Sequence, residues 1–335
     1  MVNVVITGGA GFVGSRLARE LLAAGSLGVA GGEALPVSQV TLVDKAAAPP
    51  DLAADGRVTT IQGDLGELLE PGHGGRDALA AADVIFHLAA AVSGECEADF
   101  DLGMRANLQV TESLLAACRA GGTNPVVVYS SSVAVFGGSA EHPLAAVVED
   151  DTLPNPQTSY GVQKFIGEQL MADYTRKGFL RGRSLRLMTV SVRPGRPNAA
   201  ASGFLSGIIR EPLAGQRAVC PVDPDTEVAL ASPAKAIGGL LRAATSSDEA
   251  WGGRTAVNLP ALTVSVGDMA AALEQVAGPE VSALIDWIPD PAVARMFATW
   301  PGRVHSERAA RLGLTPDPDF VSIINLHRAE SATGR

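Results

Sequence analysis

Residues 2–14 read Val2-Asn3-Val4-Val5-Ile6-Thr7-Gly8-Gly9-Ala10-Gly11-Phe12-Val13-Gly14, a β-branched run followed by a glycine-rich turn. The run predicts a strand over residues 2–6, and apolar residues at helical spacing predict a helix over residues 12–24. Glycine recurs at every third position, at Gly8, Gly11 and Gly14. Such glycines allow a tight turn, close approach of the backbone to a pyrophosphate and close packing of helix on strand. Because they stand between a strand and a helix, they indicate a dinucleotide site rather than a plain flexible turn.

Further contacts to a dinucleotide are expected where successive strands end. The strand over residues 40–43 is followed by Asp44, whose carboxylate accepts hydrogen bonds from ribose hydroxyls and repels a 2′-phosphate. NAD is therefore favoured over NADP, although the adjacent Lys45 leaves NADP open. His87 ends another strand, and a histidine there is more often a packed residue than a catalytic one. The residues expected to contact NAD along this edge are Gly8, Gly11, Phe12, Val13, Gly14, Asp44, Asp64, Leu65, Leu88, Ala89 and Ala90.

Short apolar runs alternate with helical patterns through the first half of the chain. Strands are expected at residues 2–6, 40–43, 58–61, 84–87 and 126–129, with helices at 12–24, 106–119 and 159–177. Strands that are apolar on both faces and separated by helices are typical of a parallel sheet covered on both sides. The predicted fold class is α/β, a Rossmann-type doubly wound parallel sheet. Residues 25–36 are predicted to form a surface loop.

Prolines become frequent beyond Arg193, and they break the chain into short pieces. This region predicts a smaller C-terminal substrate-binding cap, with helices near residues 203–213 and 234–244. We therefore divide the chain into two domains. Residues 1–193 form an NAD-binding Rossmann domain that carries the catalytic residues. Residues 194–330 form mainly the cap, with some segments able to return to the Rossmann domain.

The composition suits a folded protein that binds neither nucleic acid nor membrane. Hydrophobic residues make up 47% of the chain and charged residues 19%, with a formal net charge of −10. That charge repels nucleic acid and anionic membrane, and it means that an anionic substrate needs locally placed cations. Three widely spaced cysteines, Cys96, Cys118 and Cys220, suggest buried thiols rather than disulfides, and no cluster of metal ligands is evident. With no signal peptide or long apolar run, the expected location is cytoplasmic.

A proton-transfer site is indicated where the fifth strand ends and the next helix begins. Ser130-Ser131-Ser132 ends the strand, and Tyr160 and Lys164 lie four residues apart, so both side chains share one helix face. A phenol has a pKa of about 10. An adjacent ammonium, with the positive charge of an oxidised nicotinamide, favours the phenolate. A serine hydroxyl can hold the substrate oxygen in line, so the set predicts proton transfer coupled to hydride transfer.

These motifs, in this order over roughly residues 1–200, resemble the extended short-chain dehydrogenase/reductase superfamily, which includes the nucleotide-sugar epimerases and dehydratases. The resemblance implies Tyr160 as acid/base and Lys164 as ribose ligand and pKa modifier. Residues 131–137 match the family's S-S-x-x-x-[YF]-G pattern, which implies Ser132 as the serine that polarises the substrate. Tyr160 and Lys164 thus also count among the cofactor contacts.

The resemblance implies further contacts outside these motifs. Asn107 and Pro194, the latter in a loop after the sixth strand, correspond to cofactor contacts of the family. An asparagine inside a helix more often bonds the backbone locally, so both interpretations of Asn107 stay open. Members of the family often pair through the helix that carries Tyr160, which implies a homodimer.

Departures from the family patterns narrow the activity. Dehydratases of the family carry Thr-Asp-Glu where this chain has Ser132-Val133-Ala134, which disfavours a 4,6-dehydratase. Residues 193–222 and 232–237 resemble a subfamily of dehydrogenases of carbohydrate metabolism that act on short sugar acids such as D-erythronate. That resemblance implies NAD-dependent oxidation of the 2-hydroxyl to a 2-oxo acid. The alternatives are a nucleotide-sugar epimerase that retains NAD and, less favoured, a cofactor-sensing regulator.

A short anionic substrate calls for an arginine fork. Arg193, Arg196 and Arg210 all lie in the predicted cap, and Arg196 is preferred as the carboxylate anchor. A surface ion pair is the alternative for each of these arginines. The residues expected to contact substrate are Ser93, Ser132, Tyr160, Arg196 and Asn198.

Overall fold

The computed structural model describes residues 1–195 and 202–332 of the chain. Within these residues the largest sheet has eight strands, and seven of them run parallel in the order β11-β7-β6-β5-β1-β3-β4. Their bounds are β1 (Val2–Thr7), β3 (Ala34–Asp44), β4 (Val58–Gln62), β5 (Val84–His87), β6 (Val126–Ser132), β7 (Arg181–Leu187) and β11 (Val257–Asn258). The chain reverses direction across the sheet at β1, between β3 and β5, which is where such folds bind ligands. The predicted fold class is confirmed.

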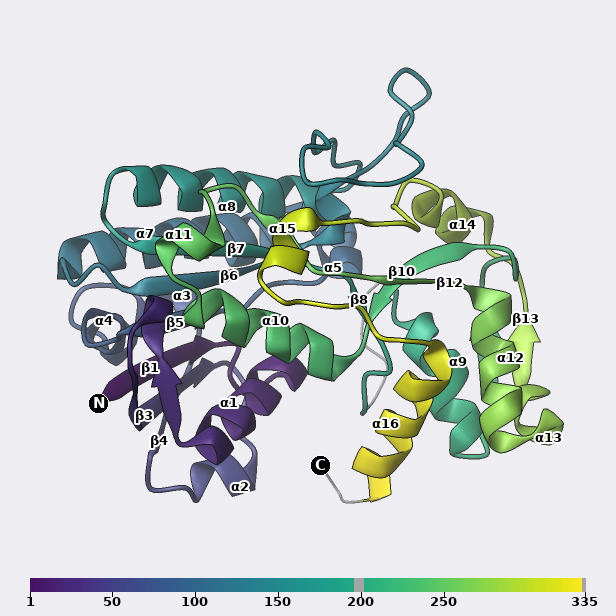
Figure 1. The fold of residues 1–335 in the computed structure, drawn as a ribbon, viewed down its shortest axis with the longest axis horizontal. Helices are drawn as coiled ribbons and strands as arrows, with labels where there is room; N and C mark the ends of the chain where they lie inside the picture. The colour runs from purple at the N-terminus through teal and green to yellow at the C-terminus, as the bar shows by residue number, and fades with distance from the viewer. Residues whose placement is uncertain (196–201, 333–335) are drawn as a thin grey trace.

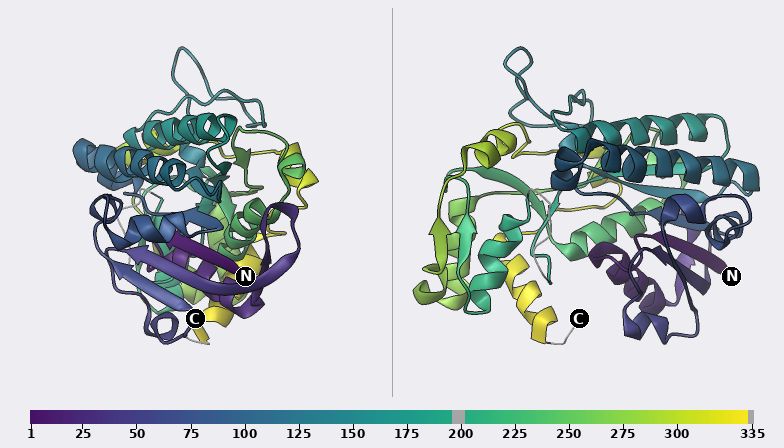
Figure 2. Two further views of the ribbon diagram at one scale, coloured as in Figure 1. Left: turned by 90° about the vertical axis from the view of Figure 1, so that its left-hand side faces the viewer. Right: turned by 180° about the vertical axis from the view of Figure 1, so that it is seen from behind.

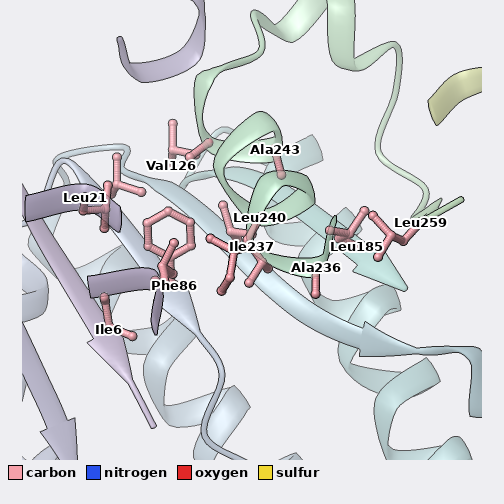
Figure 3. Packing of buried hydrophobic residues seen from close by; sticks show 14 of the residues in the cluster. Ile6, Leu21, Phe86, Val126, Leu185, Ala236, Ile237, Leu240, Ala243 and Leu259 are labelled. Atoms are coloured by element: carbon pink, nitrogen blue, oxygen red, sulfur yellow. The ribbon is translucent and has the colours of Figure 1, made fainter. Parts of the chain in front are cut away.

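Helices cover both faces of this sheet (Figure 1). The longer helices α7 (Val110–Gly121) and α8 (Ser159–Arg176) lie on one face, and α1 (Phe12–Ala24) and α10 (Pro233–Thr245) lie on the other. Side chains alternate along each strand, so Val5 and Ile85 pack toward α7 while Ile6 and Phe86 pack toward α1 and α10. Figure 3 shows Ile237 and Leu240 of α10 pointing toward Phe86. This two-sided burial explains why the strands read as continuous apolar runs.

Shorter helices and turns lie between the strands and long helices of this part of the molecule. They are α2 (Pro50–Ala53), α3 (Leu65–Leu68), α4 (Gly74–Ala80), α5 (Ser93–Ala98), α6 (Phe100–Gly103), α11 (Asp248–Trp251), α15 (Glu307–Arg311) and the 3₁₀ turns η1 (Val29–Gly31) and η3 (Val133–Val135). A π-helical turn, η2 (Met104–Gln109), leads into α7. The helix predicted over residues 106–119 is therefore π-helical in its first turn.

A C-terminal lobe has its own hydrophobic core at one end of the molecule, opposite the N-terminal strands (Figure 2). Its elements are β8 (Thr189–Val190), α9 (Phe204–Leu213), β9 (Ala218–Cys220), β10 (Glu227–Ala231), β12 (Leu262–Ser265), α12 (Val266–Ala277), α13 (Pro279–Ser282), β13 (Ile285–Trp287), α14 (Pro291–Phe297) and α16 (Phe320–Ala332). Other parts of the chain beyond residue 193 lie with the main sheet, because β11 pairs with β7 and α10 packs on it. Of the helices in residues 1–195 and 202–332, none is long and apolar enough to cross a membrane.

The loop predicted over residues 25–36 is wrong. Residues 26–28 form β2 (Ser26–Gly28), which pairs antiparallel with the first residues of β3. Leu27 is 6% exposed and belongs to the core beside α1 and α10. The glycines and the single proline of this segment suggested a loop, but burial of its few apolar side chains decides the structure instead.

Candidate active site

The glycine-rich turn forms a cradle at the start of α1. Gly8 has φ of +71°, which favours glycine, and a Cβ on Gly14 would lie 2.2 Å from the carbonyl oxygen of Gly8. The Cβ of a residue at position 11 would meet only that same oxygen, at 3.2 Å. Gly8 and Gly14 thus serve the turn and the packing, and Gly11 leaves space for a ligand. Gly11 is the N-cap and offers no side-chain cap, so the first amides of α1 remain available to a phosphate.

Asp44 lies at the end of β3, beside this turn. Its carboxylate accepts hydrogen bonds from the backbone N–H groups of Ala10, at 3.0 Å, and Ala46, at 2.9 Å. The ammonium of Lys45 is held by Asp64 at 2.7 Å, and that ion pair lowers the pKa of the Asp64 carboxyl. The lysine that left NADP open thus has an acidic partner, in an ion pair that is exposed to solvent. Together these contacts favour NAD.

A cleft of about 480 Å³ runs along the carboxyl edge of the sheet from this turn. Of the predicted cofactor contacts, those that line it are Gly8, Gly11, Phe12, Val13, Gly14, Asp44, Asp64, Leu65, Leu88, Ala89 and Ala90. Gly8 and Ala89 approach closely, since a Cβ on Gly8 would lie 2.9 Å from the Ala89 nitrogen. The cleft joins a turn that exposes helix amides to an acidic strand end, the arrangement that a dinucleotide requires.

Asn107 and Pro194 do not line this cleft. Asn107 is 2% exposed. Its Oδ1 accepts a hydrogen bond from the N–H of Ala91, and its Nδ2 donates to the carbonyl oxygen of Ala91 and, at 2.8 Å, to Oε1 of Gln163. It therefore fixes the segment that carries Ala90 and Ala91, which is a structural task. Pro194 faces a separate hollow beside Arg210 and His327. Both positions came from the family pattern alone, which does not give the direction of a side chain.

A second pocket of about 220 Å³ adjoins the cleft and holds Ser132, Tyr160, Lys164 and Ser93. Ser132 ends β6, and its Oγ accepts a hydrogen bond from the N–H of Ala134 at 3.1 Å. Tyr160 and Lys164 stand on the first turns of α8, which Thr158 caps by accepting from the N–H of Gly161. Lys164 donates to the carbonyl oxygen of Ser130 at 2.9 Å, so the β6 end and the α8 start are tied together.

The two titratable groups of this pocket respond mainly to burial. Burial raises the pKa of the Tyr160 phenol to about 12, against the lowering effects of Ser132 and Arg193. Burial lowers the pKa of the Lys164 ammonium to about 8, against the opposing effect of Glu168. The prediction that an adjacent ammonium and an oxidised nicotinamide together favour the phenolate concerns the site with NAD bound, and in the chain by itself burial is the largest effect on this pKa. Desolvation disfavours the phenolate more than the neighbours favour it.

A buried ion pair between Glu168 and Arg186 contacts the end of β6, which carries Ser131 and Ser132. Glu168 is one turn beyond Lys164 and accepts two hydrogen bonds from Arg186 of β7, at 2.8 and 2.7 Å. The hydroxyl of Ser131 donates to the same carboxylate at 2.5 Å. Glu168 is 3% exposed and Arg186 5%, so water does not screen the pair. Ser131 and Ser132 both line the pocket, and the hydroxyl of Ser131 is engaged by Glu168.

Of the arginines in the part of the chain that the structure describes, Arg193 is the one that lines the pocket. It lines both the cleft and the smaller pocket, and it interacts electrostatically with Tyr160. Arg210 instead pairs with Glu211 at 2.5 Å and faces the hollow beside Pro194. Arg196 and Asn198 lie outside the described residues. The sequence offered one signal in favour of Arg193, because Arg193 follows a strand more closely than Arg196 does.

Comparisons with known proteins agree on one group. A model described as "NAD dependent epimerase/dehydratase family" matches residues 4–229. The D-erythronate dehydrogenase of Cupriavidus necator is 46% identical over 335 residues, covering 100% of both chains. That of Haemophilus influenzae is 37% identical over 327 residues, covering 96% of this chain and 98% of its own. A solved structure described as a nucleoside-diphosphate-sugar epimerase, from Agrobacterium tumefaciens, is 42% identical with a TM-score of 0.89, covering 100% of this chain and 95% of that one.

Proposed function

Because the chain belongs to the NAD-dependent epimerase/dehydratase family, we propose that it oxidises the 2-hydroxyl of a short sugar acid, such as D-erythronate, to the 2-oxo acid. The observation that carries this proposal is the small pocket beside the cofactor cleft. Its described lining includes the cations Lys164 and Arg193 and no acidic residue, although the whole chain has a net charge of −10. A local excess of positive charge in an acidic protein suits a small anion.

The residues of the pocket divide the chemistry among them. NAD, when bound in the cleft, supplies the acceptor for a hydride. Tyr160 takes the proton of the 2-hydroxyl, and Ser132 orients that hydroxyl by hydrogen bonding. Lys164 binds the ribose side of the cofactor and stabilises the phenolate of Tyr160 electrostatically. Ser93 also lines this pocket, and we expect it to contact the substrate.

The activity is tested by mixing the purified enzyme with NAD and D-erythronate and following NADH by its absorbance. We expect net NADH that grows in proportion to enzyme, and a 2-oxo acid in matching amount. Four- to six-carbon aldonates, tested in parallel, define the preferred chain length. Absence of NADH with all of these acids, while NAD still binds, contradicts the proposal.

The epimerase alternative has support from the name of the Agrobacterium tumefaciens structure. An epimerase that retains NAD returns the hydride, so it predicts no net NADH in the same assay. The described pocket, at about 220 Å³, is below the range of about 300–1,000 Å³ that is typical of larger ligands, and a nucleotide sugar is such a ligand. A cofactor-sensing regulator has no use for a proton-transfer pair, which Tyr160 and Lys164 provide.

Cofactor choice is expected to depend on Asp44. Asp44→Asn removes the negative charge that repels a 2′-phosphate, so we expect the preference for NAD over NADP to fall by about tenfold or more. The dissociation constants of both cofactors, measured by calorimetry, give this ratio directly. Asp51→Asn is the matched control, because Asp51 is exposed and pairs with Arg19 away from the cleft. An unchanged ratio in Asp44→Asn removes Asp44 from the cofactor site.

We also infer that the enzyme is a homodimer. Three apolar side chains on neighbouring helices are exposed, with Phe100 on α6 60% exposed and Val162 and Ile166 on α8 41% and 37% exposed. Their position supports a homodimer that pairs through α8, because solvent-exposed apolar surface is stabilised by burial.

Cys96, Cys118 and Cys220 are buried free thiols, which supports a cytoplasmic location. We propose that residues 1–193 serve cofactor binding and catalysis and that residues 194–330 form mainly a substrate cap, with α10 and β11 returning to the main sheet.

A further inference from the structure

We infer that Arg193 is the residue that anchors the substrate carboxylate, and that it does so from the wall shared by the cofactor cleft and the catalytic pocket. This inference rests on the proposed function and specifies how the site selects an acid. The carboxylate carbon of a 2-hydroxy acid is bonded directly to the carbon that reacts. Its anchor must therefore lie next to the group that takes the hydroxyl proton. Arg193 and Tyr160 line the same pocket and interact electrostatically.

The charge of Arg193 is not matched by an acidic residue. Within residues 1–195 and 202–332 it takes part in no ion pair, and residues 196–201 contain no acidic side chain. Its Nη2 donates to the hydroxyl of Ser202 at 3.2 Å, a neutral partner. Burial lowers the pKa of the guanidinium, which shows that the surrounding protein penalises its charge. An anionic ligand relieves that penalty.

The other cations near the two cavities are a lysine in an ion pair and the lysine that we assign to the cofactor ribose and to Tyr160. Of the described lining residues, the remaining positive side chains are Lys45 and Lys164. Lys45 pairs with Asp64 at 2.7 Å, and Lys164 donates to the Ser130 carbonyl at 2.9 Å. Arg193 alone among these offers a guanidinium, whose planar fork matches the two oxygens of a carboxylate.

The backbone of Arg193 is held in place before any ligand binds. Its N–H donates to the hydroxyl of Ser206 at 3.0 Å, and its carbonyl oxygen accepts from Nη1 of Arg210 at 2.7 Å. Both partners stand on α9, which is part of the core of the C-terminal lobe. Arg210 is thus a positioning residue for Arg193 rather than an anchor itself. A fixed backbone lowers the entropic cost of holding the guanidinium against the substrate.

The test compares Arg193→Gln, Arg193→Lys and the wild type by calorimetry of D-erythronate binding to the enzyme–NADH complex. We expect the dissociation constant to rise by about 10- to 100-fold in Arg193→Gln, which is the loss of a charged hydrogen-bonded pair. Arg193→Lys should lose less, because it keeps the charge and gives up only the fork. NAD binding should change by less than about threefold in both. Arg217→Gln is the matched control, an exposed arginine of the same lobe that pairs with Asp286.

A neutral analogue separates charge recognition from other effects. With the amide of D-erythronate in place of the acid, Arg193→Gln and wild type should have the same kcat/KM within about threefold. An unchanged dissociation constant for D-erythronate in Arg193→Gln overturns the inference, and so does an equal loss of NAD affinity, which assigns the guanidinium to the cofactor. The binding measurement needs no turnover. A wild type that binds D-erythronate but forms no NADH therefore contradicts the proposed function and leaves the anchor standing, and a wild type that binds no small carboxylate overturns both.

Discussion

Replacing Tyr160 with Phe lowers kcat for the hydroxy acid by about 100- to 10,000-fold and leaves NAD affinity within about threefold. The substitution removes the phenol oxygen that we propose as the acceptor of the 2-hydroxyl proton and keeps the ring, so we expect the fold to be retained. Initial rates of NADH formation and calorimetric NAD binding measure the two quantities. Near-normal turnover in this variant shows that another group is the base.

The pH dependence of the wild type checks the same assignment. Because burial raises the pKa of Tyr160 to about 12, the Tyr160 phenol is mostly protonated at neutral pH in the chain by itself. The rate of oxidation requires the phenolate, so it should rise with pH, by at most about tenfold per pH unit. Bound NAD⁺ and protonated Lys164 lower the phenol pKa, and the rise should level off where they have made the phenolate abundant. A rate that falls steadily from pH 6 to pH 9 contradicts proton removal by Tyr160.

Replacing Glu168 with Ala lowers the free energy of unfolding by about 3–5 kcal/mol. The change leaves Arg186 as an uncompensated charge that is 5% exposed, and it removes the acceptor of the Ser131 hydroxyl. Urea unfolding, followed by tryptophan fluorescence, gives the free energy. This is the largest stability effect that we expect from one side chain near the site.

The control for Glu168 lies on the same helix. Asp173 on α8 pairs with Arg176 at 2.6 Å, and both side chains are more than half exposed. Asp173→Ala should therefore cost less than about 1 kcal/mol. If both variants lose the same stability, the cost comes from helix α8 itself and not from the buried pair. Glu168→Ala should also lower kcat, because Ser131 is next to Ser132 and Glu168 favours the charged form of Lys164.

Features of the site that are local in sequence were predictable from the sequence. The turn at Gly8, Gly11 and Gly14 depends on backbone sterics within a few residues. The shared face of Tyr160 and Lys164 depends on helix geometry alone. Asp44 follows its strand directly, so its place at the carboxyl edge was fixed by the parallel order of the sheet. These are the predictions that the structure brings together in adjoining cavities.

Features that depend on chain segments far apart were not predictable in the same way. Glu168 stands at helical spacing from Lys164, but its partner Arg186 is identified only when β7 packs beside α8. Asn107 matched a family position, and only the fold shows that Ala91 and Gln163 occupy its amide. The segment over residues 26–28 was predicted as loop, and pairing with β3 makes it a strand.

The sequence by itself determined the parallel sheet, the dinucleotide turn, the proposed catalytic trio of Ser132, Tyr160 and Lys164 and, through its resemblance, the class of acid. Each of these follows from short-range geometry or from motifs that are contiguous in the chain. The tertiary structure decided that Arg193 rather than Arg210 lines the pocket, and in which direction the phenol pKa shifts in the chain by itself. Both depend on burial, and burial is a property of surfaces that meet only after distant segments have packed together.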